Sequence, residues 1–110
     1  MSPKEIFEEK APKALSKHAD KMKKVGAVFK FDISGPEGGV WTMDLKADPP
    51  TVGAGDGAKP DCTITVAQDD FDKLMGNFAV AMQLFATGKL KVDNPMVAMK
   101  LQKVLPYLKV

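Results

Sequence analysis

The chain has 110 residues, of which 45% are hydrophobic and 27% are charged, and its formal net charge is +2. This length and composition are typical of a soluble globular protein, so we expect residues 1–110 to form a single domain around one core. The slight net charge gives no support to nucleic-acid binding, which a basic stripe would indicate.

The sequence also bears on the cellular location. No apolar run approaches the ~18 residues that span a bilayer, and residues 1–13 lack the apolar centre of a secretory signal. The single cysteine, Cys62, has no partner for an internal disulfide and fits a reducing compartment. These features predict an intracellular protein.

The N-terminal segment predicts an interrupted helix. Ser2 is suited to cap its start, Pro3 to occupy the first turn and Glu5 to reach back to the cap. Apolar positions continue the helix to about Lys24, but Pro12 lies inside it, so we expect a kink or two helical pieces.

Four lysines gather near the end of this helical segment, namely Lys17, Lys21, Lys23 and Lys24. Such a cluster is usually a solvated face. The alternative is an attraction for an anionic lipid head group or a membrane surface.

The middle of the chain predicts strands. Residues 27–34 and 40–45 alternate between apolar and polar side chains, and the turn-rich residues 35–39 join them as an antiparallel hairpin. The Gly- and Pro-rich stretch that follows leaves room for a short edge strand near Thr51 and Val52.

The next segment predicts a strand and two helices. Residues 61–67 alternate again, with the apolar side facing the core. Asp69 and Asp70 are suited to cap the helix that follows. Phe78 begins a second helix, which Gly88 closes.

The C-terminal part predicts one more strand and a last helix. Residues 89–92 alternate but are too few for a helix, which indicates a strand. Asp93 or Asn94 is suited to cap the last helix, and Pro95 opens it, so that it runs to about Leu105.

This order of elements predicts an α+β fold with a mixed β-sheet. Two helices separate residues 61–67 from residues 89–92, which implies a crossover connection and parallel pairing of these last two strands.

The residue types that most often carry catalysis are scarce. His18 is the only histidine, and its lysine-rich surroundings predict a solvated imidazole. Cys62 lies on the apolar side of its strand, where cysteine acts as a small hydrophobe. Residues 53–57 are glycine-rich, but no helix start follows them, so they do not match a phosphate loop. We therefore expect no metal site, no cofactor and no enzyme activity.

An apolar stripe at helical spacing runs through the two helices after residue 67 and consists of Phe71, Leu74, Met75, Phe78, Met82 and Phe85. Ordinary core packing against the sheet explains such a stripe. Its content of phenylalanine and methionine, which adapt to irregular partners, favours the alternative that part of it faces a lipid ligand. The last helix has Met96 and Met99 on a different flank from Leu101, so one flank is free to meet a ligand.

Several segments together resemble the sterol carrier protein type 2 domain, also called the non-specific lipid-transfer domain. Residues 26–31, the turn that follows and residues 41–46 are similar to the first hairpin of the family. Residues 61–66 with Asp70 and Phe71 are similar to its next strand and helix. The segment from Phe85 to Val92, which runs into Met96 and residues 98–102, is the most specific part of the resemblance.

The resemblance implies a five-stranded mixed sheet covered on one face by about five helices, with a hydrophobic tunnel that accepts fatty acids, fatty acyl-CoA, sterols or phospholipids. It also implies a domain without catalytic residues. Family members commonly end in a peroxisomal tripeptide, whereas this chain ends Tyr107-Leu108-Lys109-Val110, so a cytoplasmic or a peroxisomal location stays open. We expect a monomer that makes transient contact with membranes.

The predicted lipid-binding residues come from the sheet, the two central helices and the last helix, and they are Trp41, Met43, Ile64, Val66, Phe71, Met75, Phe78, Met82, Phe85, Met99, Leu101, Val104 and Leu105. Lys23 and Lys24, just before the first strand, are the predicted contacts for the lipid head group. An alternative function is a protein-interaction module or an accessory domain of a peroxisomal lipid-metabolism enzyme, which docks through the same apolar surface.

Overall fold

The computed structural model describes residues 3–55, 57, 59–77, 79–104 and 107. In chain order the elements are α1 (Pro3–Glu5), a π-helical turn η1 (Ile6–Lys10), α2 (Ala11–Lys17), α3 (Ala19–Val25), β1 (Val28–Ser34), β2 (Gly39–Asp44), β3 (Thr51–Ala54), β4 (Cys62–Ala67), α4 (Gln68–Gly76), α5 (Ala79–Ala86), β5 (Leu90–Val92), α6 (Pro95–Ala98) and a 3-10 helix η2 (Met99–Lys103).

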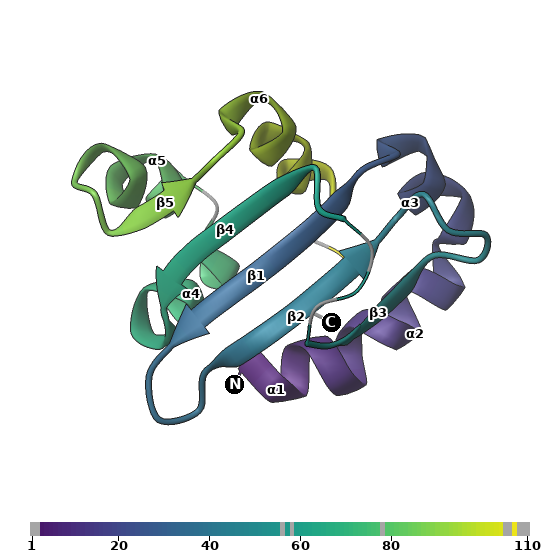
Figure 1. Ribbon diagram of the computed structural model, residues 1–110, viewed down its shortest axis with the longest axis horizontal. Helices are drawn as coiled ribbons and strands as arrows, with labels where there is room; N and C mark the ends of the chain where they lie inside the picture. Colours follow the sequence, from purple (N-terminus) through teal and green to yellow (C-terminus); the bar gives the residue numbers. More distant parts are fainter. Residues whose placement is uncertain (1–2, 56, 58, 78, 105–106, 108–110) are drawn as a thin grey trace.

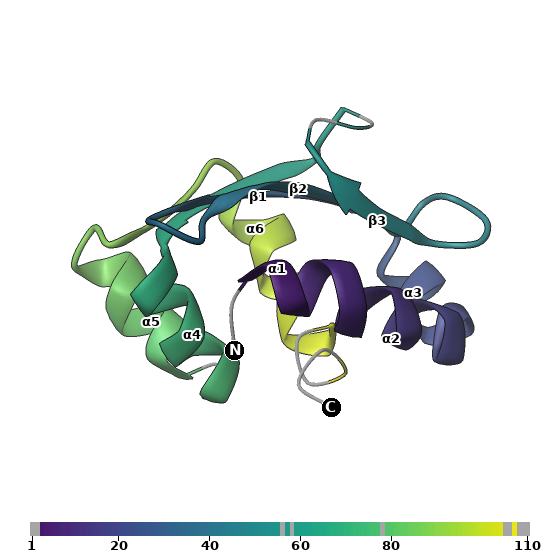
Figure 2. The ribbon, with the colours of Figure 1, turned by 90° about the horizontal axis from the view of Figure 1, so that it is seen from below.

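The strands form a five-stranded mixed sheet in the order β3-β2-β1-β4-β5 (Figure 1). The β1–β2, β2–β3 and β4–β5 pairs are antiparallel, and β1–β4 is parallel. The helices all lie on one face of the sheet (Figure 2). These observations confirm the predicted α+β class and mixed sheet.

The predicted parallel pairing of the last two strands is wrong. Strand β5 runs antiparallel to β4, with Leu90 opposite Val66. Two helices lead out from the end of β4 and back to it, so the chain re-enters the sheet at the end where it left. The parallel pair arises earlier, because the connection from β3 to β4 carries the chain across β2 and β1 before it forms β4 on the far side of β1.

The N-terminal helices divide at two places. Pro12 lies in the first turn of α2, directly after the π-helical turn η1, which confirms the predicted interruption. A second break, which the sequence did not predict, falls at His18, whose φ of −118° and ψ of 33° leave helical geometry. The predicted cap, Ser2, lies outside the described residues.

The predicted cap of α4 is wrong, and the predicted cap of α6 is confirmed. Asp69 and Asp70 do not cap α4, because the helix begins earlier, at Gln68, with Ala67 as its N-cap. Both carboxylates lie in the first turn, where the helix dipole favours them. Asn94 does cap α6, since its Oδ1 accepts a hydrogen bond from the Val97 amide at 3.3 Å.

The core lies between the sheet and the helices. Alternate side chains of the central strands are buried there, as predicted, and include Phe29, Phe31, Ile33, Trp41, Met43, Cys62, Ile64 and Val66. Phe7 of η1 is the centre of an aromatic cluster in this core. Its ring centroid is 4.7 Å from that of Phe31, 5.0 Å from Trp41 and 5.5 Å from Phe71.

The connection between β3 and β4 crosses the face of the sheet opposite the helices (Figure 2). Hydrogen bonds hold it there: the Gly57 amide donates to Thr42 Oγ1 at 3.1 Å, and the Asp61 amide donates to the Val28 carbonyl at 2.8 Å. Thr42 and Val28 point away from the helices, so this crossing explains why both are nevertheless buried.

Asp61 anchors the end of this connection. Its carboxylate accepts a hydrogen bond from the Val28 amide at 2.9 Å and lies 3.0 Å from Lys46 Nζ. The hydrogen bond from Val28 and the one from Lys46 both hold the pKa of Asp61 below its ordinary value of 3.8. The folded state therefore favours the charged carboxylate.

Replacing Asp61 with Asn should destabilise the fold at neutral pH and matter less in acid. A lowered pKa contributes stability that is present above pH 3.8 and is lost as the pH falls through the folded-state pKa. We expect a loss of about 1 kcal/mol at pH 7, at the low end for a charged hydrogen bond because the side chain is 33% exposed. Urea unfolding at pH 7 and below pH 3.8 measures it.

Asp72→Asn is the matched control, because this carboxylate is exposed on α4. Equal destabilisation by the two variants, or a difference that persists unchanged into acid, would contradict the anchoring role of Asp61.

Candidate functional site

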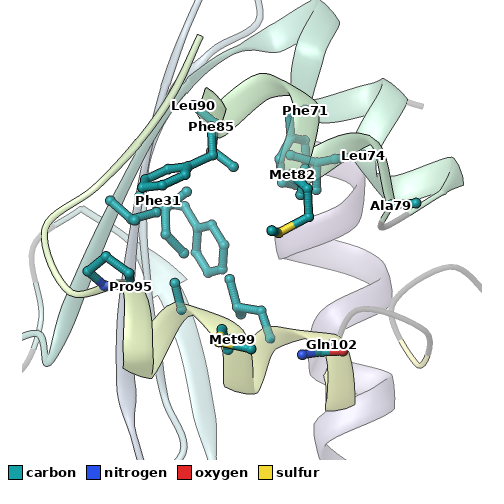
Figure 3. A pocket seen from close by; sticks show the side chains of 15 residues that line it. Phe31, Phe71, Leu74, Ala79, Met82, Phe85, Leu90, Pro95, Met99 and Gln102 are labelled. Atoms are coloured by element: carbon teal, nitrogen blue, oxygen red, sulfur yellow. The ribbon is translucent and has the colours of Figure 1, made fainter. Parts of the chain in front are cut away.

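A pocket of about 590 Å³ lies between the sheet and the C-terminal helices (Figure 3). Its lining residues come from strands β1, β4 and β5 and from the helices α4, α5, α6 and η2, and they are Phe31, Ile64, Phe71, Leu74, Ala79, Ala81, Met82, Phe85, Leu90, Val92, Pro95, Ala98, Met99, Leu101 and Gln102.

The floor of the pocket is a row of side chains that crosses three strands. Phe31 lies opposite Ile64 in the β1–β4 pair, and Ile64 lies opposite Val92 in the β4–β5 pair. Because side chains directly opposite one another share a face of the sheet, this register makes one continuous apolar row.

Two helical walls face each other across this floor. Helix α5 supplies Met82 and Phe85, and the segment α6–η2 supplies Met99 on the opposite side (Figure 3). In α6–η2 the lining residues form two rows with a spacing of three, one of Pro95, Ala98 and Leu101 and one of Met99 and Gln102. That spacing suits a segment that ends as a 3-10 helix, whose side chains eclipse every three residues.

The lining is apolar almost throughout. Among the described residues that line the pocket, Gln102 has the only amide, hydroxyl or charged side chain, and it is exposed at the edge. Such a surface offers no acid, base or nucleophile to a bound molecule. It favours alkyl surface, which gains free energy by leaving water.

Six of the predicted binding residues line the pocket: Ile64, Phe71, Met82, Phe85, Met99 and Leu101. Two others, Phe78 and Leu105, lie outside the described residues. The remaining predicted residues are buried in the core and do not line the pocket, and they are Trp41, Met43, Val66, Met75 and Val104.

Trp41 and Met43 show why an inward-facing strand residue need not line the pocket. Both face the helices as predicted, but they belong to β2, on the other side of β1 from the pocket. There the N-terminal helical segment covers them: Trp41 stacks on Phe7, and its indole Nε1 donates to Glu8 Oε2 at 3.4 Å.

The sequence prediction missed nine lining residues, namely Phe31, Leu74, Ala79, Ala81, Leu90, Val92, Pro95, Ala98 and Gln102. Leu74 was part of the apolar stripe, and the alternation of β1 and β5 marked Phe31, Leu90 and Val92 as sheet residues. Their assignment to the pocket needed the strand order, which puts β1, β4 and β5 side by side.

The predicted head-group residues lie away from the pocket lining. Lys23 and Lys24 are exposed near the end of α3, and neither lines the pocket. Lys23 Nζ is 3.1 Å from Asp48 Oδ2, so it already has a carboxylate partner.

His18 and Cys62, the two residues considered for catalytic chemistry, both pack against other side chains of the fold. His18 is half-buried rather than solvated, because its ring packs against Tyr107 with centroids 4.4 Å apart. Burial raises the pKa of the Cys62 thiol to about 11. Among the described residues, no three His, Cys, Asp or Glu side chains are grouped as metal ligands.

Comparison with known proteins identifies the family. The family model described as the SCP-2 sterol transfer family matches residues 7–106. This chain belongs to that family. The match confirms the resemblance found in the sequence and covers the whole floor and both walls of the pocket.

Relatives of this SCP-2 family chain include much longer proteins. Hydroxysteroid dehydrogenase-like protein 2 of Mus musculus is 37% identical over 84 residues, which cover 74% of this chain and 17% of that protein. Sterol carrier protein 2 of Gallus gallus is 36% identical over 103 residues, which cover 90% of this chain and 19% of that protein. The chain spans about a fifth of the length of these curated relatives.

Solved structures of the SCP-2 family share the fold. The apo form of sterol carrier protein 2 from Yarrowia lipolytica matches with a TM-score of 0.73 and 29% identity, over 96% of this chain and 85% of that chain. Sterol carrier protein 2 from Aedes aegypti, in complex with the C16 fatty acid palmitate, matches with a TM-score of 0.72 and 28% identity, over 99% of this chain and 100% of that chain.

In the part of the SCP-2 family chain that the structure describes, no helix is both long enough and apolar enough to cross a bilayer.

The thiol of Cys62 should react slowly in the folded protein. With its pKa near 11, only ~0.1% of the thiol is ionised at pH 8, and the side chain is buried. Labelling with iodoacetamide should therefore be at least about a hundredfold slower in native protein than in urea. Native and unfolded rates that agree within a few-fold would contradict the assigned environment.

Proposed function

We propose that this chain binds a lipid, with the apolar part in the pocket between the sheet, α5 and α6–η2, and that it carries this lipid without chemical change. Fatty acids are the favoured class, and fatty acyl-CoA, sterols and phospholipids are further candidates. The observation that supports the proposal is a pocket of about 590 Å³ in which none of the described lining residues has a charged side chain. That volume lies within the usual range of small-molecule sites.

The energetics of burial are sufficient for useful affinity. A chain of a dozen methylenes removed from water gains about 10 kcal/mol at ~0.8 kcal/mol each. Lost translational and rotational freedom offsets about 4 kcal/mol or more of this gain. The remainder corresponds to a dissociation constant on the order of tens of micromolar.

The relatives support the same ligand class. The Aedes aegypti protein that shares this fold over its full length holds palmitate, and we propose palmitate as the first ligand to test here. The tunnel expected from the family resemblance, the transient contact with membranes, the monomeric state and the cytoplasmic or peroxisomal location stay predictions.

An accessory role inside a larger protein is the second candidate. It is favoured by the length of the curated relatives, of which this chain matches about a fifth. A carrier should bring lipid with it through purification, whereas a docking module should not, so native mass spectrometry of freshly purified protein separates the two.

A larger side chain in the wall of the pocket should displace the lipid. Ala98 is half-buried in the wall formed by α6, and Ala98→Phe places a ring where the alkyl chain would lie. We expect palmitate to bind at least about tenfold more weakly to this variant, because an occupied cavity does not repack without strain. Displacement of a fluorescent fatty acid by palmitate measures the affinity.

Met96→Phe is the matched control, because Met96 lies on the same helix, is 82% exposed and does not line the pocket. It should bind as the wild type does. The proposal fails if wild-type protein leaves the probe free at tens of micromolar, and the site is misplaced if Ala98→Phe binds palmitate unchanged.

The head-group role of Lys23 and Lys24 can be tested separately. If they attract the carboxylate, the Lys23→Ala/Lys24→Ala double variant should bind palmitate about two- to fivefold more weakly, the range of an exposed charge pair. Hexadecanol, which lacks the charge, should bind it as it binds the wild type. The matched control is Lys4→Ala/Lys13→Ala, which removes the same charge from other exposed positions. Loss of affinity for both ligands, or for neither, would reject the head-group role.

A further inference from the structure

The described methionines fall into two groups by exposure. Met22, Met43 and Met75 are buried in the core. Met82, Met96 and Met99 have 69%, 82% and 61% of their surface exposed. Oxidation of a thioether follows its exposure, so only the second group is open to a peroxide in the folded protein.

The three exposed methionines differ in their position relative to the pocket. Met82 on α5 and Met99 on η2 both line the pocket, and they lie on opposite sides of it (Figure 3). Met96 is more exposed than either but does not line the pocket. The chain thus carries two oxidisable sulfurs at the pocket and one beside it.

We propose that Met82 and Met99 are a reversible oxidation site that controls lipid binding; this inference rests on the proposed function. Hydrogen peroxide transfers one oxygen atom to each sulfur, which loses two electrons and becomes a sulfoxide, while the peroxide is reduced to water. A methionine sulfoxide reductase reverses the step by using two thiols, which become a disulfide as the oxygen leaves as water.

The sulfoxide weakens binding because it turns an apolar wall into a polar one. In the empty pocket each S=O group accepts hydrogen bonds from water. A bound alkyl chain displaces that water, and of the lining residues that the structure describes, Gln102 alone has side-chain N–H donors to replace it. The oxidised protein therefore loses affinity for the alkyl chain and keeps its fold, since the buried methionines of the core are out of reach.

The same coupling must act in the opposite direction. If oxidation lowers the affinity for lipid, then bound lipid disfavours oxidation to the same extent at equilibrium, and it also covers the two sulfurs. Palmitate should therefore protect Met82 and Met99 from peroxide but should leave Met96 as reactive as before. This footprint reports on the two lining residues without an affinity measurement.

The experiment treats the full chain with hydrogen peroxide, with and without palmitate, and follows each methionine by peptide mass spectrometry. Palmitate affinity is measured before and after treatment. We expect oxidation to weaken palmitate binding about tenfold, the cost of leaving a polar group unpaired against an apolar chain. We also expect palmitate to slow oxidation at Met82 and Met99 several-fold, because the bound chain covers the two lining sulfurs.

Two variants make the result specific. Met96→Leu should bind palmitate as the wild type does and should still lose affinity on oxidation. Met82→Leu/Met99→Leu should keep after peroxide whatever affinity it had before, because leucine does not oxidise.

Several outcomes would overturn the inference. Equal loss of affinity in wild type and the double variant would do so, as would equal protection of Met96 by palmitate or oxidation without any change in binding. If untreated protein does not bind palmitate at all, the proposed function fails as well, so the two failures are distinguishable.

Discussion

The packing of Phe7 against Phe31 and Phe71 is the contact on which both the core and the pocket depend. Phe31 belongs to the middle strand of the sheet, Phe71 to the first helix after β4, and Phe7 to the N-terminal helical segment. Phe31 and Phe71 also line the pocket, whereas Phe7 does not. The aromatic cluster therefore separates the packed core beneath the N-terminal helical segment from the pocket beneath the C-terminal helices.

That division follows from how the helices share one face of the sheet. The N-terminal helical segment covers β2 and β3, where Trp41 and Met43 pack fully. The C-terminal helices cover β4 and β5, but α5 and α6–η2 stand on opposite sides of the row formed by Phe31, Ile64 and Val92 (Figure 3). Two walls that do not meet leave space above an apolar floor, and this space is the pocket.

The chemistry of this space limits what it can select. Where the described lining has no charged groups, binding gains free energy mainly from the removal of alkyl surface from water. Such a lining discriminates weakly between chains that differ by one methylene. Any preference among lipids has to come from the edge of the pocket, where Gln102, Met82 and Met99 lie. Methionine suits such an edge because its flexible thioether adapts to different guests.

The range of the interactions behind a feature decided whether the sequence predicted it. Features that depend on neighbours along the chain were predictable: the alternation of β1, β2 and β4, the cap formed by Asn94, and the interruption at Pro12. Family resemblance added that the helices cover one face of the sheet. The capping role assigned to Asp69 and Asp70 was wrong because the helix begins at Gln68, a difference of one or two residues that composition does not resolve.

Alternation and helical spacing established which side chains face inward, since these patterns follow from backbone geometry alone. They did not establish which inward side chains meet one another. Trp41 and Ile64 are equally apolar strand residues, yet one packs on Phe7 and the other lines the pocket, because β2 and β4 lie on opposite sides of β1. Strand order and the placement of helices over the sheet are long-range properties, and only the tertiary structure decided them.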